Sequence, residues 1–115
     1  MKREEILRLI NGKVVVGAEL GEQDVDRVFA SDLMSDVLTI KNASHLMLMT
    51  GLCNLQTIRT CEMAEIKVVM FVRGKKVTEE MKELAEENEM LLFETDYSLY
   101  RCSGILYQAG LQPLY

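Results

Sequence analysis

After residue 44 the sequence repeats one pattern three times: an apolar stretch, a short polar turn and a helical segment. The apolar stretches cover residues 45–49, 66–72 and 90–93. Strands that alternate with helices of about 10 to 14 residues predict right-handed crossovers and a parallel sheet, and uniformly apolar strands fit burial on both faces. The sequence therefore predicts an α/β fold with a mostly parallel sheet, built from consecutive βα units and flanked by helices.

Each of the three predicted helices has one face that can cover the sheet. The helices are expected over residues 54–64, from Thr78 onward, and after Asp96, the last ending near Gly110 and Pro113. Side chains three and four residues apart share a helix face. The predicted inward faces are Leu55, Ile58 and Cys61, then Met81, Leu84, Ala85 and Asn88, and finally Leu99, Cys102, Ser103 and Leu106.

The first 44 residues predict shorter elements. A helix is expected over residues 2–10, ended by residues 11–12, an Asn-Gly pair that can adopt the left-handed conformation. A short strand over residues 13–16 and a second one over residues 25–30 are expected next. A brief helix follows, and its predicted N-cap is Ser31 or Asp32.

Length and composition favour one domain over residues 1–115. The chain is 49% hydrophobic and 27% charged, which is typical of a folded protein with its own core. A net charge of -5 disfavours nucleic acid and anionic membranes as partners. The longest apolar run, residues 68–72, is far shorter than the roughly 20 residues that cross a bilayer, and residues 2–5 are charged rather than signal-like. We therefore expect a cytoplasmic protein.

The three cysteines, Cys53, Cys61 and Cys102, are too far apart in sequence for a CxxC motif, and their odd number disfavours a closed disulfide framework. We predict reduced thiols without a shared metal or disulfide. Two of them, Cys61 and Cys102, lie on predicted inward faces, where a thiol acts as a small hydrophobe.

Four polar segments follow the predicted strands and should meet at the carboxyl edge of the sheet, where ligands of open parallel sheets bind. Each segment also has a purely structural interpretation, because Asp, Asn, Thr and Gly are typical of helix caps and tight turns. The candidate binding residues are Asp32, Ser35 and Asp36, then Thr50, Gly51 and Asn54, then Arg73, Gly74, Lys75 and Lys76, and finally Thr95 and Asp96.

The basic turn over residues 73–76 is the sharpest of these candidates. It follows the most apolar strand, and Gly74 would let the backbone approach an anion while the next helix directs its N-terminus toward it. Arg73 can bind phosphate through two hydrogen bonds, and Lys75 and Lys76 add point charges. The alternative is that the lysines only balance the acidic helix that follows.

The sequence contains no catalytic constellation. His45 is the single histidine and stands at the start of an apolar strand, where we expect a structural role. A Ser-His or Cys-His device would have to use it, and nothing brings it near a cysteine. The phosphate-loop and GxGxxG signatures are both absent. We therefore expect a protein without a catalytic activity, a metal or a cofactor.

Four runs together resemble the DRTGG domain family: ASDLMSDVL (30–38), MLMTGLCN (47–54), FVRGKK (71–76) and LLFETDYS (91–98). The resemblance implies a fold similar to the N-terminal domain of HPr kinase/phosphorylase. It also implies a regulatory, ligand-sensing role without an assigned catalytic activity. Family members occur alone, some beside iron-only hydrogenase genes, and as modules joined to CBS domains or phosphate acetyltransferases.

The chain departs from the residues that give this family its name. Residues 53–54 are Cys-Asn where many members have Asp-Arg, and residues 72–74 are Val-Arg-Gly where they have Thr-Gly-Gly. If the named residues hold a ligand in other members, this chain binds something different, or contacts it through Arg73, Lys75 and Lys76.

The favoured function is a regulatory or ligand-sensing domain that binds a nucleotide or another anionic metabolite at the carboxyl edge. The alternative is an interaction or scaffold protein that dimerises, or docks onto a larger, hydrogenase-related redox enzyme, without a small ligand. A small enzyme that uses Asp32, Asp36 or Asp96 as acid or base ranks third. In either of the first two cases we expect a homodimer, the commonest oligomer of small domains with apolar surface.

Overall fold

Six strands form one sheet in the computed structural model, which describes residues 1–115. The strand order is β1-β5-β4-β3-β2-β6, and all neighbours are parallel except β1, which is antiparallel to β5. The strands are β1 (Lys13–Val16), β2 (Arg27–Ala30), β3 (Leu46–Thr50), β4 (Val68–Phe71), β5 (Leu91–Glu94) and β6 (Gln112–Pro113). The predicted mostly parallel α/β fold is confirmed.

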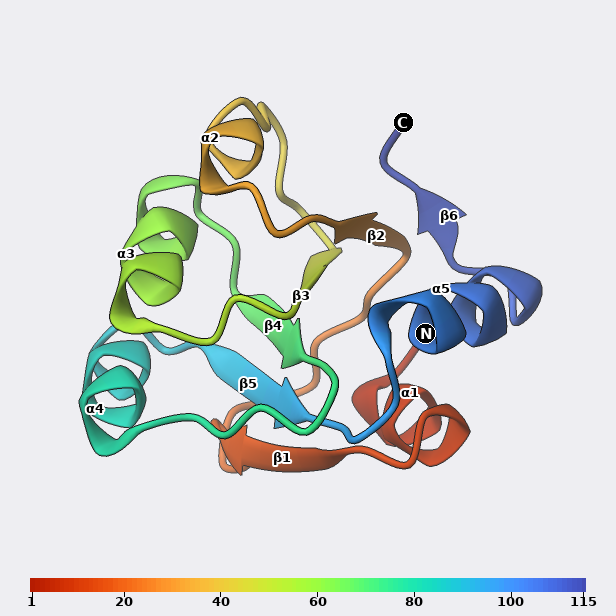
Figure 1. The fold of residues 1–115 in the computed structure, drawn as a ribbon, viewed down its shortest axis with the longest axis horizontal. Helices are drawn as coiled ribbons and strands as arrows, with labels where there is room; N and C mark the ends of the chain where they lie inside the picture. The colour runs from red at the N-terminus through yellow and green to blue at the C-terminus, as the bar shows by residue number, and fades with distance from the viewer.

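Five helices cover the two faces of the sheet. They are α1 (Arg3–Leu9), α2 (Met34–Val37), α3 (Leu55–Met63), α4 (Glu79–Glu87) and α5 (Leu99–Gln108). Figure 1 shows α2, α3 and α4 on the left of the sheet and α1 and α5 on its right. The helix that follows β4 therefore lies on the opposite face from the helix that follows β5.

Alternation along the strands divides the core into two layers. Leu48, Val69 and Phe71 pack under α3 and α4, whereas Met49, Met70 and their neighbours pack under α1 and α5. Every residue of β3, β4 and β5 is buried, as the uniformly apolar strands predicted. Each large side chain removed from water in this way contributes about 1.5 to 3 kcal/mol.

The two inward cysteines lie in different layers, because Cys61 packs in the α3 layer and Cys102 in the α5 layer. Both side chains are fully buried, as predicted. The sheet separates them, so they share no contact.

Three predicted helix starts and stops are confirmed by side-chain bonds or backbone angles. Asn54 caps α3 by accepting the Thr57 N–H, and Thr78 caps α4 by accepting the Met81 N–H. The first helix ends as expected, since Asn11 adopts a left-handed φ of 50°. Strand and helix bounds differ from the predicted ones by a few residues, as is usual at fraying ends.

Three local interpretations were wrong. The N-cap of α2 is Leu33, without a side-chain bond, whereas the Ser31 hydroxyl accepts the Leu33 N–H ahead of the helix. The Asp32 carboxylate bonds to residues 50 and 51 instead of capping α2. Ser98, not Asp96, caps α5. The sequence also did not predict β6, a two-residue edge strand beside β2 that tolerates proline because its outer side faces no other strand.

None of these helices combines the length and the apolar character that a membrane span requires.

Candidate ligand site at the carboxyl edge of the sheet

The loops after β4 and β5 diverge at the carboxyl edge, because one leads to α4 and the other to α5 on the opposite face. This is a topological switch point, the place where open α/β sheets bind their ligands. A pocket of about 270 Å³ lies there, and no apolar side chain lines it. Its lining residues are Asn11, Gly12, Lys13, Lys76, Glu94, Thr95 and Asp96.

Glu94 is the central charge of this pocket, and only 5% of it is exposed. Its Oε2 accepts the backbone N–H of Val77 at 2.8 Å, directly before α4. Its Oε1 lies 3.8 Å from the Lys13 ammonium and 3.7 Å from the Lys76 ammonium. The protein thus places its own carboxylate where an anion could meet the N-terminal end of α4 and two lysines.

Lys13 reaches Glu94 because β1 runs antiparallel to β5, which puts the two residues in register. Lys13 and Lys76 are each 65% exposed, and both ammonium groups lie at the long end of ion-pair distances. Exposed pairs of this kind contribute little, so both side chains can swing toward another partner at small cost.

The basic turn after β4 uses its backbone donors inside the protein. The N–H of Arg73 donates to the Tyr97 carbonyl at 2.8 Å, and the N–H of Gly74 donates to the Thr95 carbonyl at 3.0 Å. Both turn residues have left-handed φ angles, 61° and 72°. These bonds tie the turn to the β5–α5 loop, so the N–H groups of Arg73 and Gly74 are already used and an anion would meet the side chains of these turn residues.

Two cations of the turn remain outside any ion pair. Arg73 is exposed and Lys75 is half-buried, and neither has an acidic partner within 4.0 Å. Only Lys76 of this turn pairs, with Glu94.

Asp32 joins the loops after β2 and β3. Its Oδ1 accepts the Thr50 hydroxyl at 2.9 Å and the Gly51 N–H at 2.7 Å. Thr50 is fully buried, and its hydroxyl oxygen also accepts the Leu52 N–H. The carboxylate therefore acts as a clamp between two adjacent strands.

Nine of the twelve predicted site residues fall into three groups, and Asn54, Ser35 and Asp36 lie outside them. Lys76, Thr95 and Asp96 line the pocket, although the Thr95 hydroxyl is used to bind the Ile10 carbonyl at 2.6 Å. Asp32, Thr50 and Gly51 form the clamp farther along the edge, and Asn54 is a helix cap. Arg73, Gly74 and Lys75 form the turn beside the pocket, whereas Ser35 and Asp36 lie exposed on α2 without a side-chain partner.

Sequence reasoning missed Glu94, Lys13, Asn11 and Gly12 as members of the pocket. The available signal was the position of Glu94 at the end of an apolar strand, where β5 should reach the same edge as the basic turn. The contribution of β1 and of the turn before it had no such signal, because antiparallel pairing with β5 is a long-range feature.

Burial disfavours the thiolate form of the cysteines, which is the reactive form. Burial raises the pKa of Cys53 to about 11, with a further contribution from the charge of Glu94. Burial alone raises the pKa of Cys61 to about 12. The Cys53 thiol donates to the Lys76 carbonyl at the carboxyl edge, whereas His45 precedes β3 at the opposite edge. No group of three His, Cys, Asp or Glu residues is placed to hold a metal ion.

Comparison with known proteins supports the fold. No family model matches the sequence, and no curated protein matches it either. Among solved structures, the chain superposes with a TM-score of 0.74 on the CBS and DRTGG domains of the regulatory region of Clostridium perfringens pyrophosphatase. That structure is a complex with an activator, diadenosine tetraphosphate. The identity is 14%, and the match covers 95% of this chain and 47% of the other, so this chain spans about half of its length. The fold is thus of the kind found in that regulatory region.

Proposed function

We propose that this protein is a non-catalytic regulatory domain that senses an anionic metabolite, with a nucleotide as the favoured class, in the pocket at the carboxyl end of β5, beside β1 and the loop before α4. The observation that carries the proposal is the arrangement around Glu94. The pocket at the switch point already places a carboxylate beside two exposed lysines and the start of α4. A regulatory region of similar fold is crystallised with a dinucleotide activator.

A ligand phosphate enters this arrangement as a competitor of Glu94. Lys13 and Lys76 turn from the carboxylate to the ligand, while Glu94 keeps its bond to the Val77 N–H. Arg73 and Lys75 add charge from the adjacent turn, and Arg73 can bind phosphate through two hydrogen bonds. The ligand then bridges β1 and the loops after β4 and β5. Binding therefore moves Lys76, which lies in the loop that leads into α4, and this movement gives the domain a way to pass a signal to a partner.

Thermal unfolding in the presence of ATP, diadenosine tetraphosphate and inorganic phosphate tests this proposal. A ligand at 100 times its Kd stabilises the folded state by about 2.7 kcal/mol, which raises Tm by roughly 10 °C for a domain of this size. We expect at least one nucleotide to raise Tm and a Lys13→Ala, Lys76→Ala double variant to lose most of that shift relative to its own ligand-free Tm.

Two further variants make the result specific. An Arg73→Ala, Lys75→Ala variant should weaken binding and reduce its salt dependence, because both cations are free of ion pairs. An Arg8→Ala, Arg59→Ala variant removes the same charge from exposed helix positions outside the pocket and should bind normally. Equal affinities of all three variants and the parent would refute an anion site at this edge.

The second candidate function is that of an interaction protein, favoured by the outer surface of α5. Tyr100 and Tyr107, two helical turns apart, are 89% and 68% exposed, and Gly104 between them meets no other group. We propose that a second copy of the chain packs here, α5 against α5, giving a two-fold dimer. Light scattering should then give a dimer mass that Tyr107→Glu halves, whereas Leu33→Glu, at another exposed position, leaves it unchanged. A monomer mass for the parent would remove this candidate.

A further inference from the structure

An arginine and a tyrosine form a flat stack at the start of α5. The guanidinium carbon Cζ of Arg101 lies 3.6 Å from the centroid of the Tyr97 ring. At this distance the planar cation touches the ring face, and the two groups attract each other. One face of the guanidinium is thus covered by the tyrosine, whereas Arg101 as a whole remains exposed to solvent.

The protein holds both members of the stack in place. Tyr97 is half-buried and packs against the core layer under α1 and α5, and its N–H donates to the Thr95 hydroxyl at 3.2 Å. Ser98 caps α5 by accepting the Arg101 N–H at 3.2 Å, which fixes the first helical turn. A ligand would therefore meet a surface that is already ordered, which reduces the entropy lost on binding.

The loop between β5 and α5 connects this stack to the carboxyl-edge pocket. Thr95 and Asp96 line that pocket, and Tyr97 follows them directly. Consecutive Cα atoms are about 3.8 Å apart, so the Cα of Tyr97 lies within about 8 Å of the Cα of Thr95. The Tyr97 carbonyl also accepts the N–H of Arg73, in the basic turn beside the pocket, at 2.8 Å. The stack is therefore within reach of the base of a nucleotide whose phosphates occupy the pocket.

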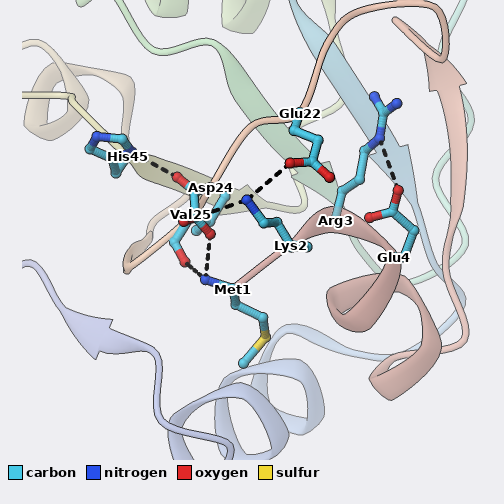
Figure 2. Close-up of polar contacts among 8 residues, drawn as sticks. All are labelled: Met1, Lys2, Arg3, Glu4, Glu22, Asp24, Val25 and His45. Carbon is cyan, nitrogen blue, oxygen red and sulfur yellow. Dashed lines mark hydrogen bonds and ion pairs between the residues drawn. The ribbon is translucent and has the colours of Figure 1, made fainter.

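Two other arginines show how this chain uses an arginine for structure alone. Arg3 donates to three backbone carbonyl oxygens, and its Nε pairs with Glu4 at 3.8 Å (Figure 2). Arg27 donates to two backbone carbonyl oxygens and pairs with Asp26 at 3.6 Å. By contrast, the Arg101 guanidinium has neither a hydrogen bond nor an ion pair, and it lies on the Tyr97 ring. Its outer face is available to a ligand.

We propose that the outer face of the Arg101 guanidinium is the base subsite of the nucleotide site, on which the nucleobase stacks while the phosphates occupy the carboxyl-edge pocket. This inference rests on the function proposed above and names the part of the ligand that distinguishes a nucleotide from a plain phosphate. Nucleobases stack on arginine planes and aromatic rings through their π-faces. Because every base has such a face, the subsite favours nucleotides over phosphorylated sugars without selecting one base.

Calorimetry with ATP and inorganic tripolyphosphate separates the base from the phosphates. Arg101→Lys keeps the positive charge but removes the flat guanidinium. The stacking of one base corresponds to about a 5- to 150-fold gain in affinity, so this variant should bind ATP at least about fivefold more weakly than the parent does. Its affinity for tripolyphosphate should equal that of the parent, because the charge is unchanged and no base is present.

A matched control makes the same chemical change elsewhere. Arg59 is an exposed arginine on α3 that does not line the pocket. Arg59→Lys should leave the affinities for ATP and for tripolyphosphate as they are in the parent. A loss of ATP affinity in this control equal to that in Arg101→Lys would overturn the assignment to Arg101.

The Nε–H resonance of Arg101 gives a readout that a purely structural role would not change. A base stacked on the guanidinium shifts this resonance through its ring current, whereas tripolyphosphate brings no ring. We expect ATP to shift the signal in a saturable manner and further than tripolyphosphate does. The signal is assigned by its loss in Arg101→Lys.

The base subsite and the anion pocket can fail separately. Equal effects of Arg101→Lys on the two affinities, or equal shifts of the Arg101 signal with both compounds, would overturn the base subsite and leave the anion pocket standing. If neither ATP nor tripolyphosphate binds to the parent, the pocket is wrong and the base subsite is wrong with it.

Discussion

Glu94 permits a test that separates its charge from its hydrogen bond. Glu94→Gln keeps the shape and an oxygen for the Val77 N–H but loses two ion pairs with lysines that are 65% exposed. Such pairs are worth about 0.2 to 1 kcal/mol each, and the charge at the start of α4 adds about 0.3 to 1 kcal/mol. Because the neutral amide of this variant buries no charge, part of the loss is offset, and we expect a net destabilisation of only about 1 kcal/mol.

Glu94→Ala should be considerably more harmful. It leaves the buried Val77 N–H without an acceptor, which costs about 1 to 3 kcal/mol in addition to the losses above. Urea denaturation followed by circular dichroism should therefore rank the free energies of unfolding as parent, Gln variant, Ala variant. Equal destabilisation by the two substitutions would refute the reasoning, since it would mean that the N–H bond contributes nothing.

The same pair of variants examines the proposed competition. Glu94→Gln releases Lys13 and Lys76, so anion affinity measured by calorimetry should rise several-fold over that of the parent. An unchanged or lower affinity would show that an anion does not displace Glu94 from these lysines. The stability ranking would still hold in that case, so the two conclusions can fail separately.

Four further substitutions have expected results that follow from the local structure. Gly74→Ala should lower stability by about 1 to 2 kcal/mol, because its φ of 72° strains any other residue, while Gly104→Ala in the open middle of α5 should raise it by up to about 1 kcal/mol; thermal unfolding measures both. The pKa of Cys61 rises from 9.0 to about 12 on folding. Its contribution to the free energy of unfolding is therefore complete below pH 9 and is lost as the pH rises toward 12. Cys61→Ala should make this alkaline loss of stability smaller in urea titrations at a series of pH values. The Met1 ammonium and Lys2 lower the pKa of Asp24 below 3.8. Its contribution to the free energy of unfolding is therefore present above that pH and is lost in stronger acid. Asp24→Asn should make the loss of stability at acid pH less steep in the same titrations.

The sheet could be predicted because its strands are apolar throughout and its helices carry their own caps. Asn54 and Thr78 bond to N–H groups three positions away, so their capping role can be predicted from the local sequence. Asp32 is of a residue type that is typical of helix caps, but its carboxylate bonds to Thr50 and Gly51. These two residues lie next to it only because of the register of β2 and β3. Long-range register is a property of the packed sheet, and local pattern does not contain it.

The candidate site was predictable to the same extent. Convergence of the post-strand segments at one edge follows from topology, and the structure places Lys76, Thr95 and Asp96 together there. The burial of Glu94 could not be predicted from the sequence, because a glutamate after an apolar stretch is typical of a solvated loop. The conformation of His45 was also not predicted: it is adjacent to a buried strand, yet it has a left-handed φ of 59° and remains exposed.

The position of β1 has a consequence for the order of folding. Strands β3, β4 and β5 are each neighbours of the strand before them in sequence, so they can join β2 one βα unit at a time. By contrast, β1 pairs with β5, and joining them closes a loop that contains most of the chain, which is entropically expensive. We expect this pairing to form after the rate-limiting step. Substitutions that weaken Val16 in β1 should therefore mainly accelerate unfolding, whereas those that weaken Val69 in β4 should mainly slow refolding in stopped-flow experiments.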